Sequence, residues 1–97
     1  MEHFVSRDGM KISYTMDDFT DPWTRPEPML LLHAAMGNAV RWFRWVPALA
    51  RRFRVVRMEL RGHGQSQKPA PDQPFALEDL VGDALQLLDG LEIDQAH

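Results

Sequence analysis

One stretch, from Phe53 to Ser66, constrains the fold more than any other part of the sequence. It reads FRVVRMELRGHGQS, an apolar run that leads into a turn with Gly62 and Gly64 on either side of His63. The apolar half predicts a buried strand, and the glycines predict a tight turn directly after it. Ligands of open α/β sheets bind at the carboxyl ends of strands. We therefore expect this turn to lie where a functional site would form.

The length and composition indicate one small globular domain. The chain has 97 residues, 44% of them hydrophobic and 26% charged, close to the averages of globular proteins. Its apolar runs are only a few residues long, against about 20 for a membrane-spanning helix, and its first ten residues lack the apolar core of a secretory signal. Cysteine is absent, which excludes disulfides. We expect a cytoplasmic domain over residues 1–97, with no second domain and no membrane partner.

The arginines are concentrated in one half of the chain. Residues 29–61 contain seven arginines and one acidic residue, whereas residues 62–97 contain seven acidic residues and one lysine. The simplest interpretation is ion pairing between the halves, or solvated helix faces. The alternative is a nucleic-acid surface in which the arginines alternate with aromatic side chains. Those aromatic residues are Trp42, Phe43, Trp45 and Phe53. The net charge of −3 and the lack of a nucleic-acid motif argue against this alternative, so we expect no nucleic-acid partner.

Three further strands are expected before the Phe53 stretch. Asp8-Gly9 is a hairpin turn signal between strands at Phe4–Ser6 and Met10–Met16, and the second of these alternates apolar and polar residues. Residues 17–28 contain three prolines and no periodicity, which predicts a surface loop. Met29–Leu32 is a run of four apolar residues, typical of a parallel strand that is buried on both faces.

Two helical regions are expected. Residues 39–52 have a helical pattern apart from Pro47, which is tolerated at the first position of a helix. We therefore expect a single turn at Val40–Arg44 and a short helix from Pro47 to Arg51 or Arg52. The second helix spans Leu77–Leu91, with Gly90 as its stop signal and apolar residues at helical spacing.

Several apolar side chains are expected to face the core. Those of the first helical region are Trp42, Trp45, Val46 and Leu49. Those of the second helix are Leu77, Leu80, Val81, Ala84, Leu88 and Leu91. Trp23, in the loop before the third strand, is expected to cap an edge of the core. The element order is then β, β, β, α, β, α, which predicts an α/β fold with an antiparallel hairpin followed by parallel strands and flanking helices.

Two loops of this sequence resemble those of the α/β-hydrolase superfamily. Leu30–Gly37, LLLHAAMG, resembles the family's strand and His-Gly loop, and Glu59–Ser66, ELRGHGQS, resembles its Asp-x-Arg-Gly-His-Gly-x-Ser turn. The likeness extends over nearly all of the chain, and it implies the N-terminal portion of an α/β-hydrolase sheet. In that family a nucleophile elbow, Gly-x-Ser-x-Gly, follows the helix that Leu77–Leu91 resembles. No Gly-x-Ser-x-Gly occurs in these 97 residues.

The resemblance implies roles for residues in both loops. It makes the backbone amide of Ala35 one donor of the oxyanion hole, in a loop with His33 and Gly37, and Ala34 stands where the family usually has glycine. The other loop lies at the mouth of the active site, and its residues are Glu59 (where the family usually has aspartate), Arg61, Gly62, His63, Gly64 and Ser66. The nucleophile, acid and base fall outside this chain. No cofactor motif or metal-ligand spacing is present, so we expect neither a cofactor nor a metal.

The resemblance implies hydrolysis of a small-molecule ester, lactone or similar carboxylic derivative through a downstream nucleophile-His-acid triad. Epoxide hydrolases, dehalogenases and C–C bond hydrolases share the fold and stay open as alternatives. So do a non-catalytic binding module and one half of a split protein. The strand at Met29–Leu32 would have a bare edge, which we expect to pair with the C-terminal part of the family's sheet. We expect the 97-residue chain alone to be weakly stable and inactive.

Overall fold

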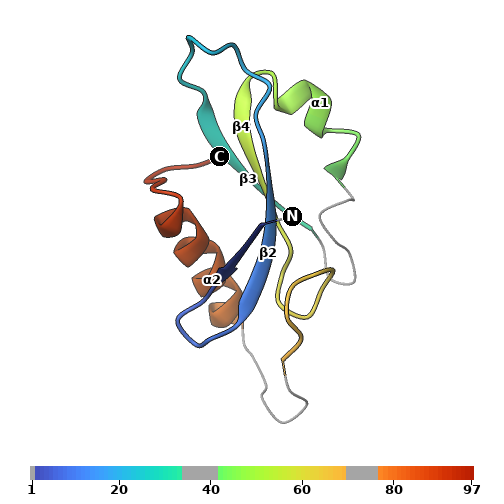
Figure 1. Ribbon diagram of the computed structural model, residues 1–97, viewed down its shortest axis with the longest axis vertical. Helices are drawn as coiled ribbons and strands as arrows, with labels where there is room; N and C mark the ends of the chain where they lie inside the picture. The colour runs from blue at the N-terminus through green and yellow to red at the C-terminus, as the bar shows by residue number, and fades with distance from the viewer. Residues whose placement is uncertain (1, 34–41, 70–76) are drawn as a thin grey trace.

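The computed structural model describes residues 2–33, 42–69 and 77–97 of the chain. This part contains a four-stranded sheet and two α-helices (Figure 1). In chain order the elements are β1 (Glu2–Val5), β2 (Lys11–Asp17), β3 (Glu27–Leu32), α1 (Val46–Leu49), β4 (Phe53–Met58) and α2 (Leu77–Gly90).

The sheet is mixed, and its strand order is β1-β2-β4-β3. β1 pairs antiparallel with β2, and β2 pairs antiparallel with β4. β3 and β4 are parallel, in a register that runs from Glu27 opposite Phe53 to Leu32 opposite Met58. The predicted α/β class, with a hairpin followed by parallel strands, is therefore confirmed. The carboxyl ends of β3 and β4 lie side by side, so the two loops singled out in the sequence leave the same edge of the sheet.

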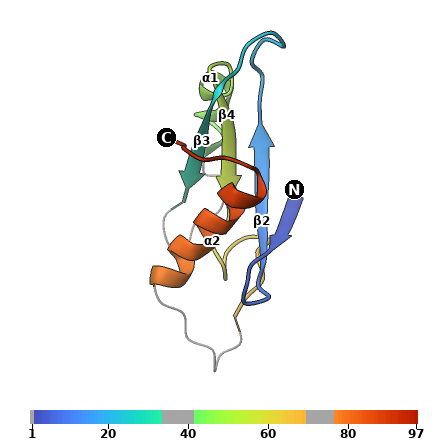
Figure 2. The same cartoon turned by 90° about the vertical axis from the view of Figure 1, so that its left-hand side faces the viewer.

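α1 and α2 lie on opposite faces of the sheet (Figure 2), and alternation along β4 supports a hydrophobic cluster under each helix. Successive side chains of a strand point to opposite faces, which places Val55 on one side and Val56 and Met58 on the other. The cluster under α1 contains Leu31, Val46, Ala50 and Val55. The cluster under α2 contains Met10, Ile12, Val56, Met58, Ala84, Leu87 and Ile93. Because both faces are covered, β4 has buried apolar residues on both sides, Val55 on one and Val56 and Met58 on the other, although Arg54 and Arg57 interrupt the run.

The strand bounds differ from the expected ones by one or two residues. β3 begins at Glu27 because Glu27 and Pro28 extend the pairing with β4. A proline is compatible with that position since β3 lies at the edge of the described sheet. β4 ends at Met58 rather than at Leu60, and β1 begins and ends earlier than predicted. α1 is a single turn that starts at Val46, and the turn expected at Val40–Arg44 lies partly outside the described residues.

Trp45, which was expected to face the core, and Trp23, which was expected to cap an edge of it, are both exposed. Trp23 is 81% exposed and Trp45 is 62% exposed. α1 is so short that only one side of it meets the sheet, and this side is formed by Val46 and Ala50, one turn apart. Trp42 and Leu49 do pack against that cluster, as predicted.

The buried face of α2 is also rotated from the expected one. Leu77 and Val81 are exposed, although their spacing placed them in the predicted apolar stripe. Ala84 is buried as predicted, and Leu88 and Leu91 are partly buried against the same cluster. Asp83 and Leu87, which were not predicted, complete the buried face. A charged residue therefore sits at the centre of the buried face, and its partner determines which side of the helix turns inward.

We expect Leu87→Ala to destabilise the chain by about 2–5 kcal/mol, because the substitution leaves a cavity between α2 and the sheet. Leu85→Ala is the matched control, since Leu85 lies on the same helix and is 57% exposed whereas Leu87 is 1% exposed. The control should change the free energy of unfolding by no more than about 0.5 kcal/mol. Urea unfolding followed by circular dichroism measures both. Equal effects of the two substitutions would contradict the observed orientation of α2.

Candidate active-site loop

The loop that follows β4 is a chain of backbone turns. His63 N–H donates to the Leu60 carbonyl at 3.0 Å, and Ser66 N–H donates to the His63 carbonyl at 3.0 Å. Gly62 and Gly64 have φ angles of 83° and 51°. Residues other than glycine rarely adopt such φ angles, which explains why glycine occupies both positions. We call residues 59–67 the Gly-His-Gly loop.

Ser66 ties this loop to β2. Its Oγ donates to the Glu59 carbonyl at 2.6 Å and accepts the Ser13 N–H at 2.8 Å. The Glu59 N–H in turn donates to the Ser13 carbonyl at 2.9 Å. Ser66 is buried and its hydroxyl is committed to backbone groups, so it acts as an anchor and not as a nucleophile.

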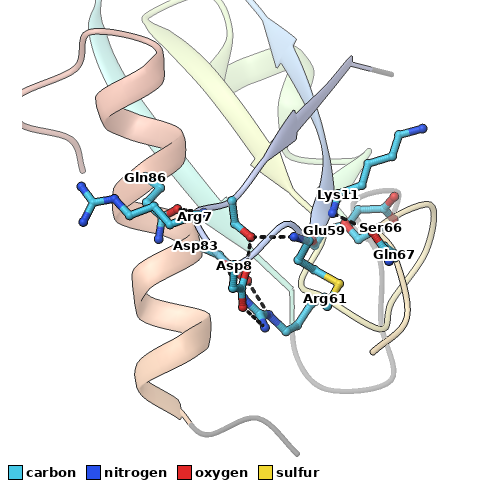
Figure 3. A network of polar contacts seen from close by, with 11 residues as sticks. Arg7, Asp8, Lys11, Glu59, Arg61, Ser66, Gln67, Asp83 and Gln86 are labelled. Carbon is cyan, nitrogen blue, oxygen red and sulfur yellow. Dashed lines mark hydrogen bonds and ion pairs between the residues drawn. The ribbon is translucent and has the colours of Figure 1, made fainter. Parts of the chain in front are cut away.

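Arg61 connects the loop to two other parts of the fold (Figure 3). Its guanidinium donates to both carboxylate oxygens of Asp83 on α2, at 2.8 and 2.6 Å, and to Asp8 in the β1–β2 turn at 2.9 Å. Arg61 and Asp83 are buried, whereas about half of the Asp8 side chain is exposed. The two carboxylates raise the pKa of Arg61, chiefly through the hydrogen bonds that Arg61 donates to Asp83. Arg61 and Asp83 also form an ion pair of the kind that the uneven charge distribution predicted.

Asp83 is the residue of this network that sequence reasoning missed. It lies between apolar positions of an amphipathic helix, and the periodicity alone assigns it to the boundary of the stripe. The available signal was an acidic residue within a turn of apolar residues, together with the arginine of the Arg-Gly-His-Gly run. Nothing in the sequence indicates that these two side chains meet.

Glu59 fills the space that Gly64 leaves open. Its carboxylate is buried, and Oε1 accepts the Gln65 N–H at 2.9 Å. A Cβ atom placed on Gly64 would lie 1.9 Å from Glu59 Oε2. The glutamate, which stands where the family usually has aspartate, therefore still holds the turn, and it does so by lying directly against the glycine.

His33 and His63 join the ends of β3 and β4. The Leu60 N–H donates to His33 Nε2 at 3.1 Å, and His63 Nδ1 lies 3.1 Å from the Arg61 carbonyl. The two imidazole rings are 5.0 Å apart, measured between centroids. Both rings therefore contact backbone atoms of the loop that follows β4. Ala35 and Gly37 lie outside the described residues, as does Ala34.

The described residues were also compared with two other kinds of site. Within residues 2–33, 42–69 and 77–97, no group of three or more His, Asp or Glu side chains could hold a metal ion. A hollow lined by Glu27, Pro28, Gln95, Ala96 and His97 lies at the other end of β3, away from His33. No helix in the described part of the chain is long and apolar enough to cross a bilayer.

A family model described as the alpha/beta hydrolase fold matches residues 27–97, which include both candidate loops. The chain belongs to the α/β hydrolase fold family. The resemblance that the two loops carry is thereby confirmed, and so is the expected fold.

Relatives within the α/β hydrolase fold family differ in their activities. The chain is 40% identical over 70 residues to the dihydrolipoyllysine-residue acetyltransferase component of the acetoin cleaving system of Pseudomonas putida, covering 72% of this chain and 18% of that protein. It is 35% identical over 69 residues to epoxide hydrolase B of Mycobacterium tuberculosis, covering 70% and 19%.

A solved structure is also similar to this chain. The enol-lactonase from Burkholderia xenovorans LB400 superposes with a TM-score of 0.86 at 30% identity, covering 99% of this chain and 35% of that structure. The chain thus spans about a fifth of the two curated relatives and about a third of the enol-lactonase. The activities named here belong to these longer proteins, of which the chain matches only a part.

Gly64→Ala should destabilise the chain well beyond the cost of its backbone angle. Gly9→Ala is the matched control, because Gly9 also has a positive φ, of 84°, but no atom lies within 4 Å of the added Cβ. The control should cost about 1–2 kcal/mol through backbone strain alone, whereas overpacking against Glu59 adds about 1–3 kcal/mol at position 64.

The double variant Glu59→Asp with Gly64→Ala tests this interpretation further. The shorter acid makes room for the Cβ, so part of the lost stability should return. Chemical denaturation of the native sequence, the two single variants and the double variant measures the coupling free energy between positions 59 and 64. If the two changes are additive, the contact between Glu59 and position 64 does not determine the choice of glycine.

Stability should depend on the charge of Asp8 at acid pH. The Ser6 hydroxyl and the Arg61 guanidinium hold the pKa of Asp8 below its ordinary value of 3.8. When folding lowers the pKa of a carboxyl group, the charged group stabilises the native state at pH values above its ordinary pKa. This contribution is lost as the pH falls through the native pKa.

Asp8→Asn should therefore lower the free energy of unfolding at pH 7 by about 0.2–1 kcal/mol, a small amount because Asp8 is half exposed. The deficit relative to the native sequence should shrink at pH 3. Asp94→Asn, a change at an exposed residue, serves as the control and should show no such pH dependence. A deficit that is constant between pH 7 and pH 3 would contradict the assigned charge pairing.

Proposed function

We propose that this chain forms the N-terminal part of the catalytic domain of an α/β hydrolase that cleaves a small ester, lactone or similar carboxylic derivative. The match of the family model to residues 27–97 carries the proposal, because this range contains both the His33 loop and the Gly-His-Gly loop. The enol-lactonase similarity supports the carboxylic substrate class. A cytoplasmic location is part of the same proposal and fits a sequence without cysteine.

The chemical role of the chain would be to stabilise negative charge. A nucleophile from outside residues 1–97 attacks the carbonyl carbon, a histidine accepts its proton, and an acid orients that histidine. The carbonyl oxygen becomes an oxyanion, and one backbone amide directed at it supplies about 3–4 kcal/mol of transition-state stabilisation. We assign one such donor to the Ala35 amide, in the loop that begins at His33 and includes Gly37.

The outer edge of β3 would pair with the strand that carries the nucleophile. The His97 N–H donates to the Pro28 carbonyl at 3.0 Å, and the Leu30 N–H donates to the His97 carbonyl at 2.8 Å. His97 thus bonds to two residues of β3 that are two positions apart, Pro28 and Leu30. This is the hydrogen-bond pattern between two parallel strands. A strand continuing this ladder from His97 would end beside His33, where the nucleophile is needed. The same edge could accept a separate polypeptide if the protein is split.

A chimera tests the proposed oxyanion role. Residues 1–97 replace the matching first third of the Burkholderia enol-lactonase, and lactone hydrolysis is measured. We expect the chimera to turn over the lactone. Ala35→Pro removes the amide N–H, so it should lower kcat by about 10²–10³-fold, whereas Ala35→Gly keeps the N–H and should retain most of the activity. A folded chimera in which Ala35→Pro retains full activity would overturn the assignment.

The 97-residue chain alone should not hydrolyse p-nitrophenyl butyrate, because it contains no Gly-x-Ser-x-Gly elbow. Release of p-nitrophenol above the buffer rate measures this. Turnover that a serine-directed phosphonate abolishes would contradict the expectation. A chain that instead binds a second polypeptide tightly, without any gain of hydrolysis, would favour the binding-module alternative.

A further inference from the structure

The apolar surface of α2 is wider than the part of it that the sheet covers. Ala84 and Leu87 are 8% and 1% exposed and pack against the sheet. Leu77, Val81 and Leu85 are instead 72%, 50% and 57% exposed. Because residues four apart are neighbours on the surface of a helix, these three side chains form one row along α2. We call Leu77, Val81 and Leu85 the α2 stripe.

The α2 stripe faces away from the hairpin of β1 and β2. Gln86 accepts the Arg7 N–H of the β1–β2 turn at 2.6 Å, and Asp83 binds Arg61 (Figure 3). At about 3.6 residues per turn, Gln86 and Asp83 lie across the helix from Val81. The strand order is β1-β2-β4-β3, so the side of α2 opposite the hairpin is the side of the outer edge of β3.

The path of the chain around the sheet explains which face each helix occupies. The connection that carries α1 leads from β3 inward to β4. The connection that carries α2 leads outward from β4 to His97, which bonds to Pro28 and Leu30 on the outer edge of β3. Connections between parallel strands are right-handed in about 98% of cases, so opposite directions across the sheet place the helices on opposite faces. Figure 2 shows α1 and α2 on opposite faces, as this rule requires.

The same rule gives the place of the next helix. A strand that continues from His97 would be the outermost strand beside β3. A further parallel strand outside it would be reached by another outward connection, whose helix would lie on the face that α2 occupies. That helix would run beside α2 on the side of the β3 edge, where the α2 stripe is exposed. Neighbouring helices pack with their axes about 8–10 Å apart, close enough for a row of leucine and valine side chains to be buried between them.

The charges of α2 argue against a second copy of this helix as the partner. Leu77–Gly90 contains four acidic residues and no lysine, arginine or histidine. Two of the acidic residues, Glu78 and Asp89, are exposed one turn away from Val81 and Leu85. Two stripes that faced each other would bring these carboxylates of both copies close together, and like charges across an interface are unfavourable.

We propose that the α2 stripe is the docking surface for the helix that follows the next strand of the same α/β hydrolase domain. This inference rests on the proposed function, because that strand and helix belong to the part of the hydrolase beyond residue 97. A nucleophile elbow joins a strand to the helix after it. The α2 stripe therefore holds the helix that begins at the elbow, and it is covered in the complete domain.

Val81→Gln tests the proposal in two proteins of different length. In the 97-residue chain position 81 is exposed, so the equilibrium constant for unfolding should change by less than about 3-fold. In the chimera with the Burkholderia enol-lactonase, the same change places a polar side chain between two helices. The unfolding constant of the chimera should therefore rise by at least about 10-fold. Urea titration followed by circular dichroism measures both constants.

Two further variants complete the comparison. Leu85→Gln changes a second residue of the α2 stripe and should behave as Val81→Gln does. Val5→Gln is the matched control, because Val5 is 67% exposed but lies on β1, at the edge of the described sheet furthest from β3. It should change the unfolding constant by less than about 3-fold in both proteins. The comparison with Val5→Gln within the chimera does not depend on the stability of the short chain.

An effect of Val81→Gln in the chimera no larger than that of Val5→Gln would overturn the proposal. So would sedimentation of the 97-residue chain as a dimer that Leu85→Gln converts to a monomer, since a second copy would then cover the stripe. If the chimera does not fold, the same variants are made in an enol-lactonase that carries only Leu77–Gly90 in place of its matching helix, and failure of both hybrids to fold would also overturn it. None of these measurements uses turnover, so a folded chimera that does not hydrolyse lactone would count against the proposed function alone.

Discussion

A buried arginine joins the separate parts of this domain. Arg61 binds Asp83 on α2 through two hydrogen bonds and Asp8 in the β1–β2 turn through a third. A buried charge that loses its partner is strongly destabilising, so the loop, the helix and the hairpin must take positions that keep these contacts. This constraint explains why α2 turns a carboxylate toward the sheet and leaves Leu77 and Val81 exposed.

The same contacts change how the role of the Gly-His-Gly loop is interpreted. Glu59, Arg61 and Ser66 belong to a motif that resembles an active-site turn, yet all three side chains are buried and point into the fold. They hold the turn in place, and the glycines allow it to bend. The loop contacts His33, at the end of β3, through the Leu60 amide and the His63 ring. In the proposed hydrolase the loop is therefore a support for the adjacent catalytic loop, and its motif residues need not touch substrate.

The parts of the fold that depend on local patterns were predictable. Runs of apolar residues located β3 and β4, Asp8-Gly9 located the hairpin, and the alternation of strands and helices gave the parallel pair. Contacts between distant side chains were not predictable from spacing. Asp83 reads as a boundary residue until Arg61 is placed next to it, and Trp45 reads as a core residue until α1 proves to be a single turn. The family resemblance located the candidate loops, but it did not show that Ser66 and Glu59 are anchors.

The connections of the β1–β2 turn also have a consequence for the order of folding. The Arg7 N–H donates to Gln86 Oε1, a contact that spans 79 residues, and Asp8 reaches Arg61 across 53 residues. A growing polypeptide emerges from its amino end, so the first hairpin is made long before its partners on the Gly-His-Gly loop and α2 exist. Contacts this far apart in sequence also slow folding, because a long loop must close before they form. The polar turn of the hairpin therefore stays solvated until α2 is available to dock.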